Sequence, residues 1–364
     1  MKYSLSQLNP IVEQTGFPNI ITIEKVVHLL NLLNTLNSHP GLRGKLALKG
    51  GTALNLFVFD IPRLSVDIDL NYIGALDREE MINDRPQVEE AMQAVFQREG
   101  FMVKRVPTDH AGGKWRLIYQ SYTGQTENLE VDINFMFRQP LWDIKNIDSH
   151  QLGTFQAKNI PVFNTYELYA GKLAALFSRD QARDLFDSHR LLKKEDQINR
   201  EKLRLAFVVY GAMNRKDWRT ISLDDITFTE NELKQKLMLV LKPGVASYQD
   251  DVVLFGRTLK EECKHKLSIV YPLERNEIEF LDLLLDKGEI KAKLLTDDID
   301  LQERINRHPM LHWKAMNVKK RLGKSQVKES ERVRPQKVTE GENVIEKVRT
   351  NFQPHTVSQI KVQA

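Results

Sequence analysis

The sequence predicts an α/β domain followed by an all-α domain. Apolar and polar residues alternate over 65–73 and 128–137, which is typical of strands. After about residue 163 the apolar residues recur at helical spacing. A chain of 364 residues is longer than one compact domain usually is. We therefore divide it into an α/β domain (1–163), a helical domain (164–322) and a basic tail (323–364).

The predicted elements of the first part alternate between the two kinds. Residues 23–37 form an amphipathic helix that ends at Pro40 and Gly41. The run LALKGG at 46–51 is a short buried strand that enters a turn, and 52–59 resumes a helical pattern. Further elements are a strand at 65–73, a helix at 86–99, and strands at 115–122 and 128–137.

The second part is predicted to be helical throughout, and we identify no strand in it. Its helices cover residues from 166 to 194, 201–213, 230–241, 249–266, 274–287 and, after Pro309, 310–322. From Gly323 onward apolar content falls and no period remains, so 323–364 is predicted to be mostly disordered.

Composition excludes several classes of protein. Apolar residues make up 41% and charged residues 28% of the chain, but no apolar run approaches the roughly 20 residues of a membrane span. The N-terminus has no apolar region typical of a secretory signal. The single cysteine, Cys263, excludes an internal disulfide and a cysteine-based zinc site. We expect a cytoplasmic protein with no membrane partner.

The positive charge is concentrated at the end of the chain. Residues 314–364 hold 12 Lys and Arg against five Glu, a net charge of +7, whereas the remaining residues are close to neutral. Such a tail binds a phosphate backbone or is simply a solvated end, and the sequence leaves both interpretations open.

Two acids on one strand face are the strongest sign of a site. Because strand side chains alternate, Asp67 and Asp69 share a face with Ser65, and the intervening apolar residues anchor the opposite face in a core. Adjacent carboxylates repel each other unless a cation lies between them, and oxygen ligands suit Mg²⁺. An Asp-x-Asp pair alone is more often solvent-facing. The preceding Gly50-Gly51 turn, which lets a backbone approach phosphates, favours a metal and triphosphate site.

A third carboxylate is expected from a neighbouring strand. Glu130 and Asp132 alternate with apolar residues in NLEVDINF. We choose Asp132 because it lies deeper in the apolar run, with Glu130 as the alternative. A polar strand face unrelated to metal is the competing interpretation.

The helical segment after 163 adds cationic candidates. Lys172 lies among small and apolar residues and requires an anionic partner, such as a triphosphate; Arg179 lies on the same helix face. We interpret Arg183 and Asp187 as a structural i,i+4 ion pair. Trp218 and Trp313 are predicted to be packing residues, and the histidines show no metal-ligand spacing.

Together these motifs resemble the AbiEii/AbiGii family, which are nucleotidyltransferase toxins of type IV toxin–antitoxin and abortive-infection systems. The resemblance lies in LKGGTALNL, RLSVDIDL, EVDINF, ELYAGKLAALFSRDQARDLFD and ERINRHPMLHWKAMNV, and spans roughly 45–320. It implies a polymerase β-like fold for the α/β domain, with the active site between the two domains. The first motif is shared by the wider superfamily, and the later ones are more particular to this family.

The resemblance also implies roles for individual residues. Asp67 and Asp69 would bind Mg²⁺, to which the strand pattern adds Asp132 as the expected third ligand, and Asp184 would be an essential acid. Lys172 would neutralise phosphate charge. The set expected to hold the NTP is Gly50, Gly51, Thr52, Arg63, Ser65, Lys172 and Arg179.

The expected activity is Mg²⁺-dependent transfer of a nucleotide from an NTP to an acceptor, taken as the 3′ end of a tRNA because some relatives modify it. A cognate antitoxin protein is the expected partner. The alternatives are phosphoryl or nucleotidyl transfer to a protein, and a catalytically inactive nucleotide-binding regulator.

Overall fold

A computed structural model describes residues 2–107, 109–245 and 251–332 of the chain. By their contacts, Met1–Arg321 form one compact unit and Leu322–Ala364 a second. The arrangement below concerns the first unit.

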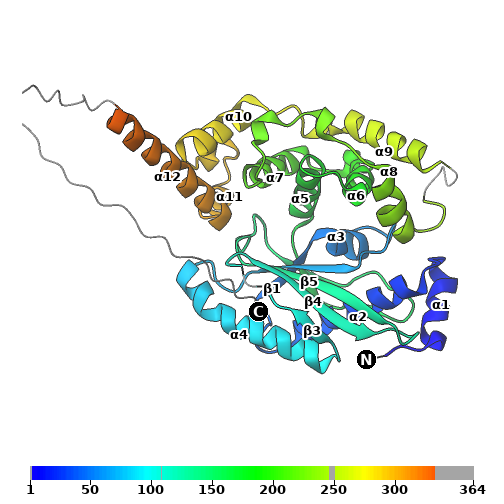
Figure 1. The fold of residues 1–364 in the computed structure, drawn as a ribbon. Helices are drawn as coiled ribbons and strands as arrows, with labels where there is room; N and C mark the ends of the chain where they lie inside the picture. The colour runs from blue at the N-terminus through cyan, green and yellow to red at the C-terminus, as the bar shows by residue number, and fades with distance from the viewer. Residues whose placement is uncertain (1, 108, 246–250, 333–364) are drawn as a thin grey trace, which may run out of the picture. The chain divides into compact units, whose positions relative to one another are not determined.

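The centre of this unit is a seven-stranded sheet in the order β3-β4-β5-β2-β1-β7-β6 (Figure 1). Its strands are β1 (Leu46–Lys49), β2 (Asp67–Tyr72), β3 (Met102–Arg105), β4 (Gly112–Gln120), β5 (Thr126–Asn134), β6 (Lys145–Ile147) and β7 (Ile160–Val162). The four strands expected from the sequence are confirmed. The sequence did not predict β3, β6 and β7, which have only three or four residues each and therefore carry no clear alternation.

The central strand β2 runs antiparallel to β1 and parallel to β5. Ile68 and Leu70 are buried on one face, as their alternation predicted, whereas Asp67 and Asp69 are half-buried on the other. The parallel register places Asp69 beside Asp132. Two acids far apart in the chain therefore become neighbours on one face of the sheet.

Helices cover both faces of the sheet. The helices that precede or connect its strands are α1 (Leu5–Thr15), α2 (Ile20–Ser38), α3 (Gly50–Ala53), the π-helical η1 (Leu54–Val58) and α4 (Arg78–Arg98). In Figure 1, α2 and α4 lie below the sheet and α3 lies above it. The sequence placed the start of α4 at 86, but the helix begins earlier because Asp77 caps it by accepting hydrogen bonds from the backbone N–H groups of Glu79 and Glu80.

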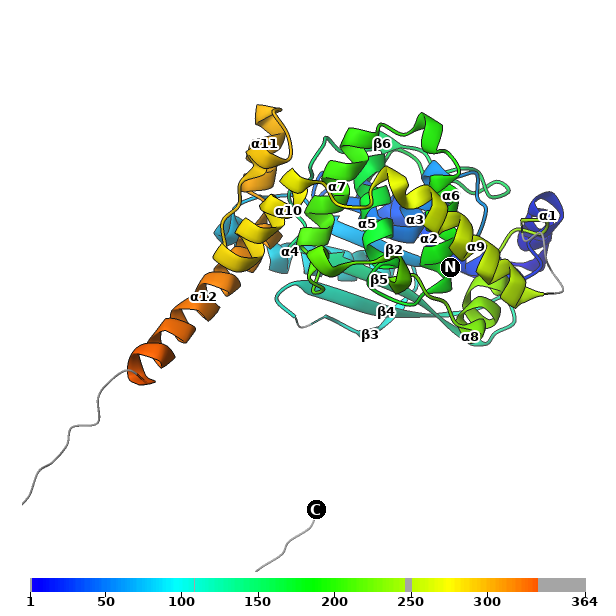
Figure 2. The same cartoon turned by 90° about the horizontal axis from the view of Figure 1, so that it is seen from above.

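After Val162 the described elements are helices. They are α5 (Thr165–Leu176), α6 (Ala182–Leu192), η2 (Glu195–Gln197), α7 (Arg200–Ala212), η3 (Trp218–Thr220), η4 (Leu223–Asp225), α8 (Glu230–Glu232), η5 (Leu233–Leu237), η6 (Met238–Val240), α9 (Val252–Lys266), η7 (Leu267–Ile269), α10 (Arg275–Asp282), η8 (Leu283–Lys287), η9 (Ala292–Leu294), α11 (Ile299–Asn306) and α12 (Pro309–Arg332). From above, α5, α6, α7 and α9 lie over the sheet (Figure 2). That these helices form a domain of their own, divided from the sheet at 163/164, stays a prediction.

The last helix differs from its prediction. α12 continues to Arg332, past residue 322, where we expected the tail to begin. The rest of the predicted tail, 333–364, lies outside the described residues.

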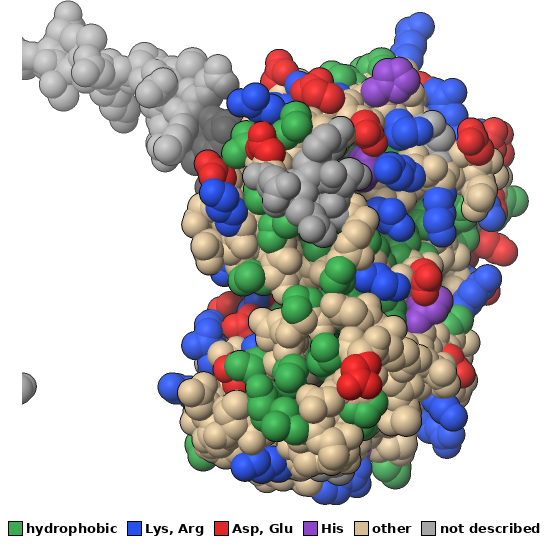
Figure 3. All heavy atoms as spheres, turned by 90° about the vertical axis from the view of Figure 1, so that its right-hand side faces the viewer, with side chains coloured by type: hydrophobic (Ala, Val, Ile, Leu, Met, Phe, Trp, Pro, Cys, Tyr) green, Lys and Arg blue, Asp and Glu red, His purple; other side chains and the backbone are tan. Residues whose placement is uncertain are grey.

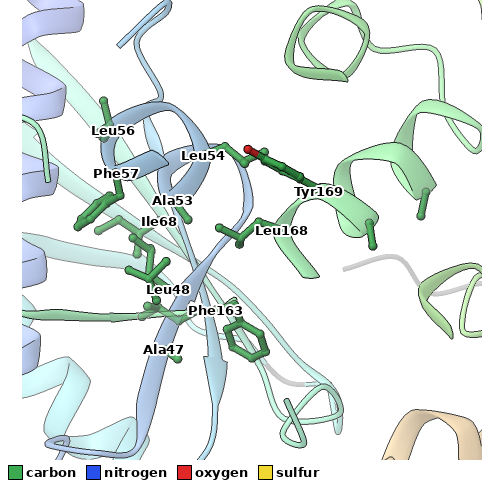
Figure 4. Packing of buried hydrophobic residues seen from close by; sticks show 14 of the residues in the cluster. Ala47, Leu48, Ala53, Leu54, Leu56, Phe57, Ile68, Phe163, Leu168 and Tyr169 are labelled. Carbon is green, nitrogen blue, oxygen red and sulfur yellow. The ribbon is translucent and has the colours of Figure 1, made fainter. Parts of the chain in front are cut away.

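A continuous core joins the sheet to α5. Leu168 and Tyr169 of α5 approach Leu54 of η1, next to the β1 residues Ala47 and Leu48 (Figure 4). These side chains are all at most 7% exposed. The core therefore fixes α5 against the motif between β1 and β2, and α5 carries Lys172.

The surface corrects one prediction about tryptophan. Trp218 is fully buried, as expected, but Trp313 is 48% exposed and is not a packing residue.

The face in Figure 3 mixes positive, negative and uncharged side chains, with hydrophobic ones between them. Within the described ranges, no helix combines the length and the apolar character needed to cross a bilayer.

Candidate active site

A cavity of about 600 Å³ lies between the acidic face of β2 and β5 and the helices α5 and α6. The sheet contributes Asp67, Asp69 and Asp132 to its wall. The helical side contributes Lys172 and, with it, Arg179, Arg183 and Asp184. Three acids of the sheet thus face three cations of the helices across a space large enough for a nucleotide, and Lys49 and Lys114 also line the sheet side.

The acids of the sheet are held close together. Burial raises the pKa of Asp67, and repulsion from Asp69 raises it further. Burial likewise raises the pKa of Asp132. Burial and neighbouring negative charges both disfavour the ionised form of a carboxylate. Either a bound cation or a bound proton relieves this repulsion.

The alternative third acid, Glu130, has different partners. Its carboxylate binds Lys114 Nζ at 2.8 Å and Arg116 Nη2 at 3.3 Å. The hydrogen bond from Lys114 lowers the pKa of Glu130. Glu130 is not among the cavity-lining residues, whereas Asp132 is, so the geometry favours Asp132 as the third acid.

The two glycines occupy a tight space beside the acids. Gly50 has φ of +74°, and a Cβ there would lie 2.1 Å from Asp69 Oδ2. A Cβ on Gly51 would lie 3.1 Å from Arg63 Nη2 and 3.2 Å from Ser65 Oγ. Only glycine at 50 lets the chain turn directly against the acid pair.

Thr52 and Ser65 are buried beneath this turn. The Thr52 hydroxyl bonds to Ser65 Oγ at 3.0 Å and also donates to the backbone carbonyl of Asp67. These bonds fasten α3 to the start of β2. In this arrangement the Thr52 side chain positions the acids, whereas Ser65 also lines the cavity.

The Arg63 side chain forms a buried ion pair with Asp187. Its Nε lies 2.8 Å from Asp187 Oδ1 and its Nη2 lies 2.6 Å from Asp187 Oδ2. Asn55 Nδ2 donates to the same Asp187 Oδ1 at 3.1 Å. Arg63 lines the cavity, but its guanidinium already has a carboxylate partner from α6.

Lys172 is buried between two carboxylates of α6. Its Nζ lies 2.8 Å from Asp184 Oδ1 and 3.0 Å from Asp187 Oδ2. Arg179 Nε adds a contact of 2.6 Å to Asp184 Oδ2, and its side chain is 53% exposed. The anion that Lys172 required is therefore supplied by the protein itself, and Arg179 is the more accessible of the two cations.

The cations determine the charge state of these buried acids. Burial alone would raise the pKa of Asp187, but Arg63 and Lys172 outweigh it and lower the pKa to about 2. Burial opposes ionisation of Asp184 too, and Lys172 and Arg179 again lower its pKa. Both carboxylates are ionised at neutral pH.

The predicted Arg183–Asp187 pair is wrong. Asp187 faces the buried Arg63 and Lys172, whereas Arg183 Nη1 lies 3.8 Å from Asp67 Oδ2 across the cavity. The i,i+4 spacing permits such a pair, but stronger tertiary partners occupy Asp187. Arg183 therefore belongs to the cavity wall.

Sequence reasoning missed several cavity residues, among them Asn71, Phe137, Glu167 and Tyr210. Glu167 is buried in α5 and accepts hydrogen bonds from the backbone of Leu141 and Trp142. Burial raises its pKa to about 7. A glutamate on an otherwise apolar helix was the signal that could have identified it.

The donor set suits a hard divalent cation, because Asp67, Asp69 and Asp132 offer only oxygen ligands beside a glycine turn. Over the described ranges, however, no three acidic, His or Cys side chains lie close enough to share one ion. The pair on β2 fits a cation whose other ligands come from phosphate and water. Asp132 as the third ligand stays a prediction.

Comparison with known proteins points to one family. Residues 31–262 match the family model described as nucleotidyl transferase AbiEii toxin of a type IV toxin–antitoxin system. The match includes the glycine turn, the three sheet acids and the Lys172 network. No curated protein matches the chain.

A solved structure shares this fold. MenT4, a nucleotidyltransferase toxin from Mycobacterium tuberculosis, is 16% identical with a TM-score of 0.55, covering 81% of this chain and 96% of that one. A putative nucleotidyltransferase from H. pylori is 18% identical with a TM-score of 0.40, covering 75% and 100%. The first of these likenesses supports a nucleotidyltransferase toxin fold with a mixed sheet and many helices.

Proposed function

This chain belongs to the AbiEii family of nucleotidyl transferase toxins of type IV toxin–antitoxin systems, and from this premise we propose that it transfers a nucleotide from an NTP to a tRNA 3′ end. The observation that carries the proposal is the cavity itself. Asp67, Asp69 and Asp132 line one wall, and a lysine and two arginines lie on the other. A triphosphate needs both, since the cations offset its charge and the acids bind the divalent ion that accompanies it.

In the proposed reaction, the acceptor hydroxyl oxygen attacks the α-phosphorus of the NTP. The bond from that phosphorus to the bridging oxygen of the β-phosphate breaks, and pyrophosphate leaves. The hydroxyl proton passes to the Asp132 carboxylate, which lines the cavity beside Asp67 and Asp69.

Asp67 and Asp69, with Asp132, would hold Mg²⁺, which when bound stabilises negative charge on the phosphate oxygens. Arg179 and Arg183 are half-exposed on the opposite wall and would contact the β- and γ-phosphates. Lys172 would act indirectly. Its ion pair with Asp184 holds that carboxylate in place, and Asp184 in turn orients the Arg179 side chain.

Membership of a type IV system implies an antitoxin partner. We propose that the toxin acts in the cytoplasm, where NTPs and tRNA are available.

The test is incubation of the protein with each α-³²P-labelled NTP, Mg²⁺ and total RNA, with a parallel arm of total protein. Label in the tRNA band supports the proposal. Label only in protein would replace the RNA acceptor with a protein one. A further arm uses γ-³²P-labelled NTP, and labelled product there would indicate phosphoryl transfer. The absence of transfer in every arm would leave the nucleotide-binding regulator.

A further inference from the structure

The cavity continues past the acids to a part that the proposed reaction does not use. Asn71 lies two residues beyond Asp69 on the same strand face, and it lines the cavity. Its side chain is 1% exposed. Neither Oδ1 nor Nδ2 of Asn71 has a hydrogen-bond partner among the described residues.

A buried amide without partners is costly. Leaving a buried donor or acceptor unpaired destabilises a fold, because the group loses its hydrogen bonds to water and gains none in the protein. An apolar side chain at position 71 would avoid that cost, as Leu70 does on the other face of the strand. An amide kept there indicates a partner that binds from the cavity, either a ligand or a water molecule.

Aromatic residues line the same cavity as this amide. Asn71 is the register partner of Asn134 on β5. The Asn134 Oδ1 accepts from the backbone N–H groups of Met136 and Phe137 at 2.8 and 3.0 Å, which turns the chain at this point. The Phe137 ring lies 6.0 Å from the Tyr210 ring, and both line the cavity.

The Tyr210 ring is itself held in place. Its hydroxyl donates to Glu167 Oε1 at 3.2 Å, and Glu167 is fixed by the backbone of the 141–142 turn. An aromatic surface of fixed orientation and an unpaired amide in one cavity have the chemistry that binds a nucleobase, through its face and its edge.

We propose that Asn71 is a specificity-determining residue, and that its amide pairs with the edge of a nucleobase whose face contacts Phe137 and Tyr210. This rests on the proposed function, because the phosphates and acids place a nucleotide in the same cavity. The base belongs either to the incoming NTP or to the last nucleotide of the acceptor. Both present the same chemistry, and the two arms of the experiment separate them.

Three variants test the proposal. Asn71→Leu removes both pairing atoms, and Asn71→Asp keeps the shape but leaves only acceptors. Asn214→Ala is the matched control, because Asn214 lines the same cavity but its amide already bonds to Ser178 Oγ (2.7 Å) and the Lys216 N–H (3.1 Å). In one arm kcat/KM is measured for each NTP with a fixed RNA; in the other, for RNAs ending in each nucleotide with a fixed NTP.

Asn71→Leu is expected to reduce the wild-type preference among bases about tenfold in one arm, because a bidentate amide–base pair supplies discrimination of that order. Asn71→Asp is expected to shift preference toward guanine, whose N1–H and N2–H₂ both donate to a carboxylate. Asn214→Ala should keep the wild-type ranking. Unchanged ranking in both arms for both Asn71 variants would overturn the proposal and leave Asn71 with a buried water.

Failure of base recognition by Asn71 can be distinguished from absence of nucleotide transfer. If the wild type transfers no label, the proposed function fails, and Asn71 is then tested by melting temperature with each NTP and Mg²⁺. Unequal shifts that become equal in Asn71→Leu, or that move toward the guanine nucleotide in Asn71→Asp, support base recognition. Equal shifts in the wild type for all NTPs, and also for short RNAs that end in each of the four nucleotides, overturn it.

Discussion

Asp187 on α6 accepts two hydrogen bonds from the Arg63 guanidinium, which precedes β2 by only a few residues. Both side chains are at most 3% exposed. This bidentate pair connects the segment that leads into the acidic strand with the helix that carries the basic wall. The separation of the two walls therefore depends on a contact that neither sequence segment reveals alone.

Arg63→Met or Asp187→Asn should destabilise the fold by about 3–5 kcal/mol, because each leaves its former partner buried and unpaired. Urea unfolding of both variants measures the loss. The control is Arg307→Met, whose partner Glu303 is in an exposed i,i+4 pair and should contribute less than about 0.5 kcal/mol. Losses as small as the control would mean that the buried pair is not structural.

The pH dependence of stability should reflect Glu167. Its pKa is raised from 4.5 to about 7 in the folded chain, so the unfolded chain loses this proton first as the pH rises. Unfolding free energy attributable to Glu167 therefore falls between about pH 4.5 and 7 and is constant above that. Glu167→Gln should be more stable than the wild type near pH 8 and similar near pH 4.5, by thermal melting. A parallel pair of pH profiles would contradict this.

Asp187 should give the opposite dependence at acid pH. Its folded pKa of about 2 lies below the ordinary 3.8, so its contribution is present above about pH 4 and is lost as the pH falls toward 2. Asp187→Asn should remove that part of the acid transition in a pH titration followed by circular dichroism.

Asp67→Asn, Asp69→Asn and Asp132→Asn should each abolish label transfer while the fold is retained. Asp67→Asn should even stabilise the metal-free protein slightly, because it removes a repulsion with Asp69 that raises the Asp67 pKa. Glu130→Gln is the control and should retain transfer, since Glu130 pairs with Lys114 and Arg116 and does not itself line the cavity. Addition of Mg²⁺ with NTP should raise the melting temperature of the control and not of Asp67→Asn. Normal transfer by any of the three acid variants would refute the assignment.

Lys172 and Arg183 should differ in what they affect. Lys172→Met should lower both the melting temperature and transfer, because it leaves Asp184 and Asp187 buried with one cation fewer. Arg183→Ala should leave the melting temperature nearly unchanged and raise KM for the NTP, since Arg183 faces Asp67 across the cavity. A stability loss in Arg183→Ala as large as that in Lys172→Met would restore the local pair that we reject.

The sequence by itself determined the acidic face. A period of two fixes which side chains share a strand face, and so Asp67 and Asp69 were predictable, as were the glycine turn and the alternation around Asp132. The helical period after residue 163 likewise predicted α5 and α6. These are local features, and local sequence is sufficient to specify them.

Only the tertiary structure decided the partners. Arg63 and Asp187 are 124 positions apart, and nothing in either segment indicates that they meet. Parallel pairing of β2 with β5 placed Asp132 beside Asp69, whereas Lys114 and Arg116 of β4 pair with Glu130. Packing of α5 against α6 gave Lys172 two carboxylates rather than an open site. Periodicity indicates which face of an element a side chain occupies. Which other element packs against that face depends on how all the elements of the chain pack around the core.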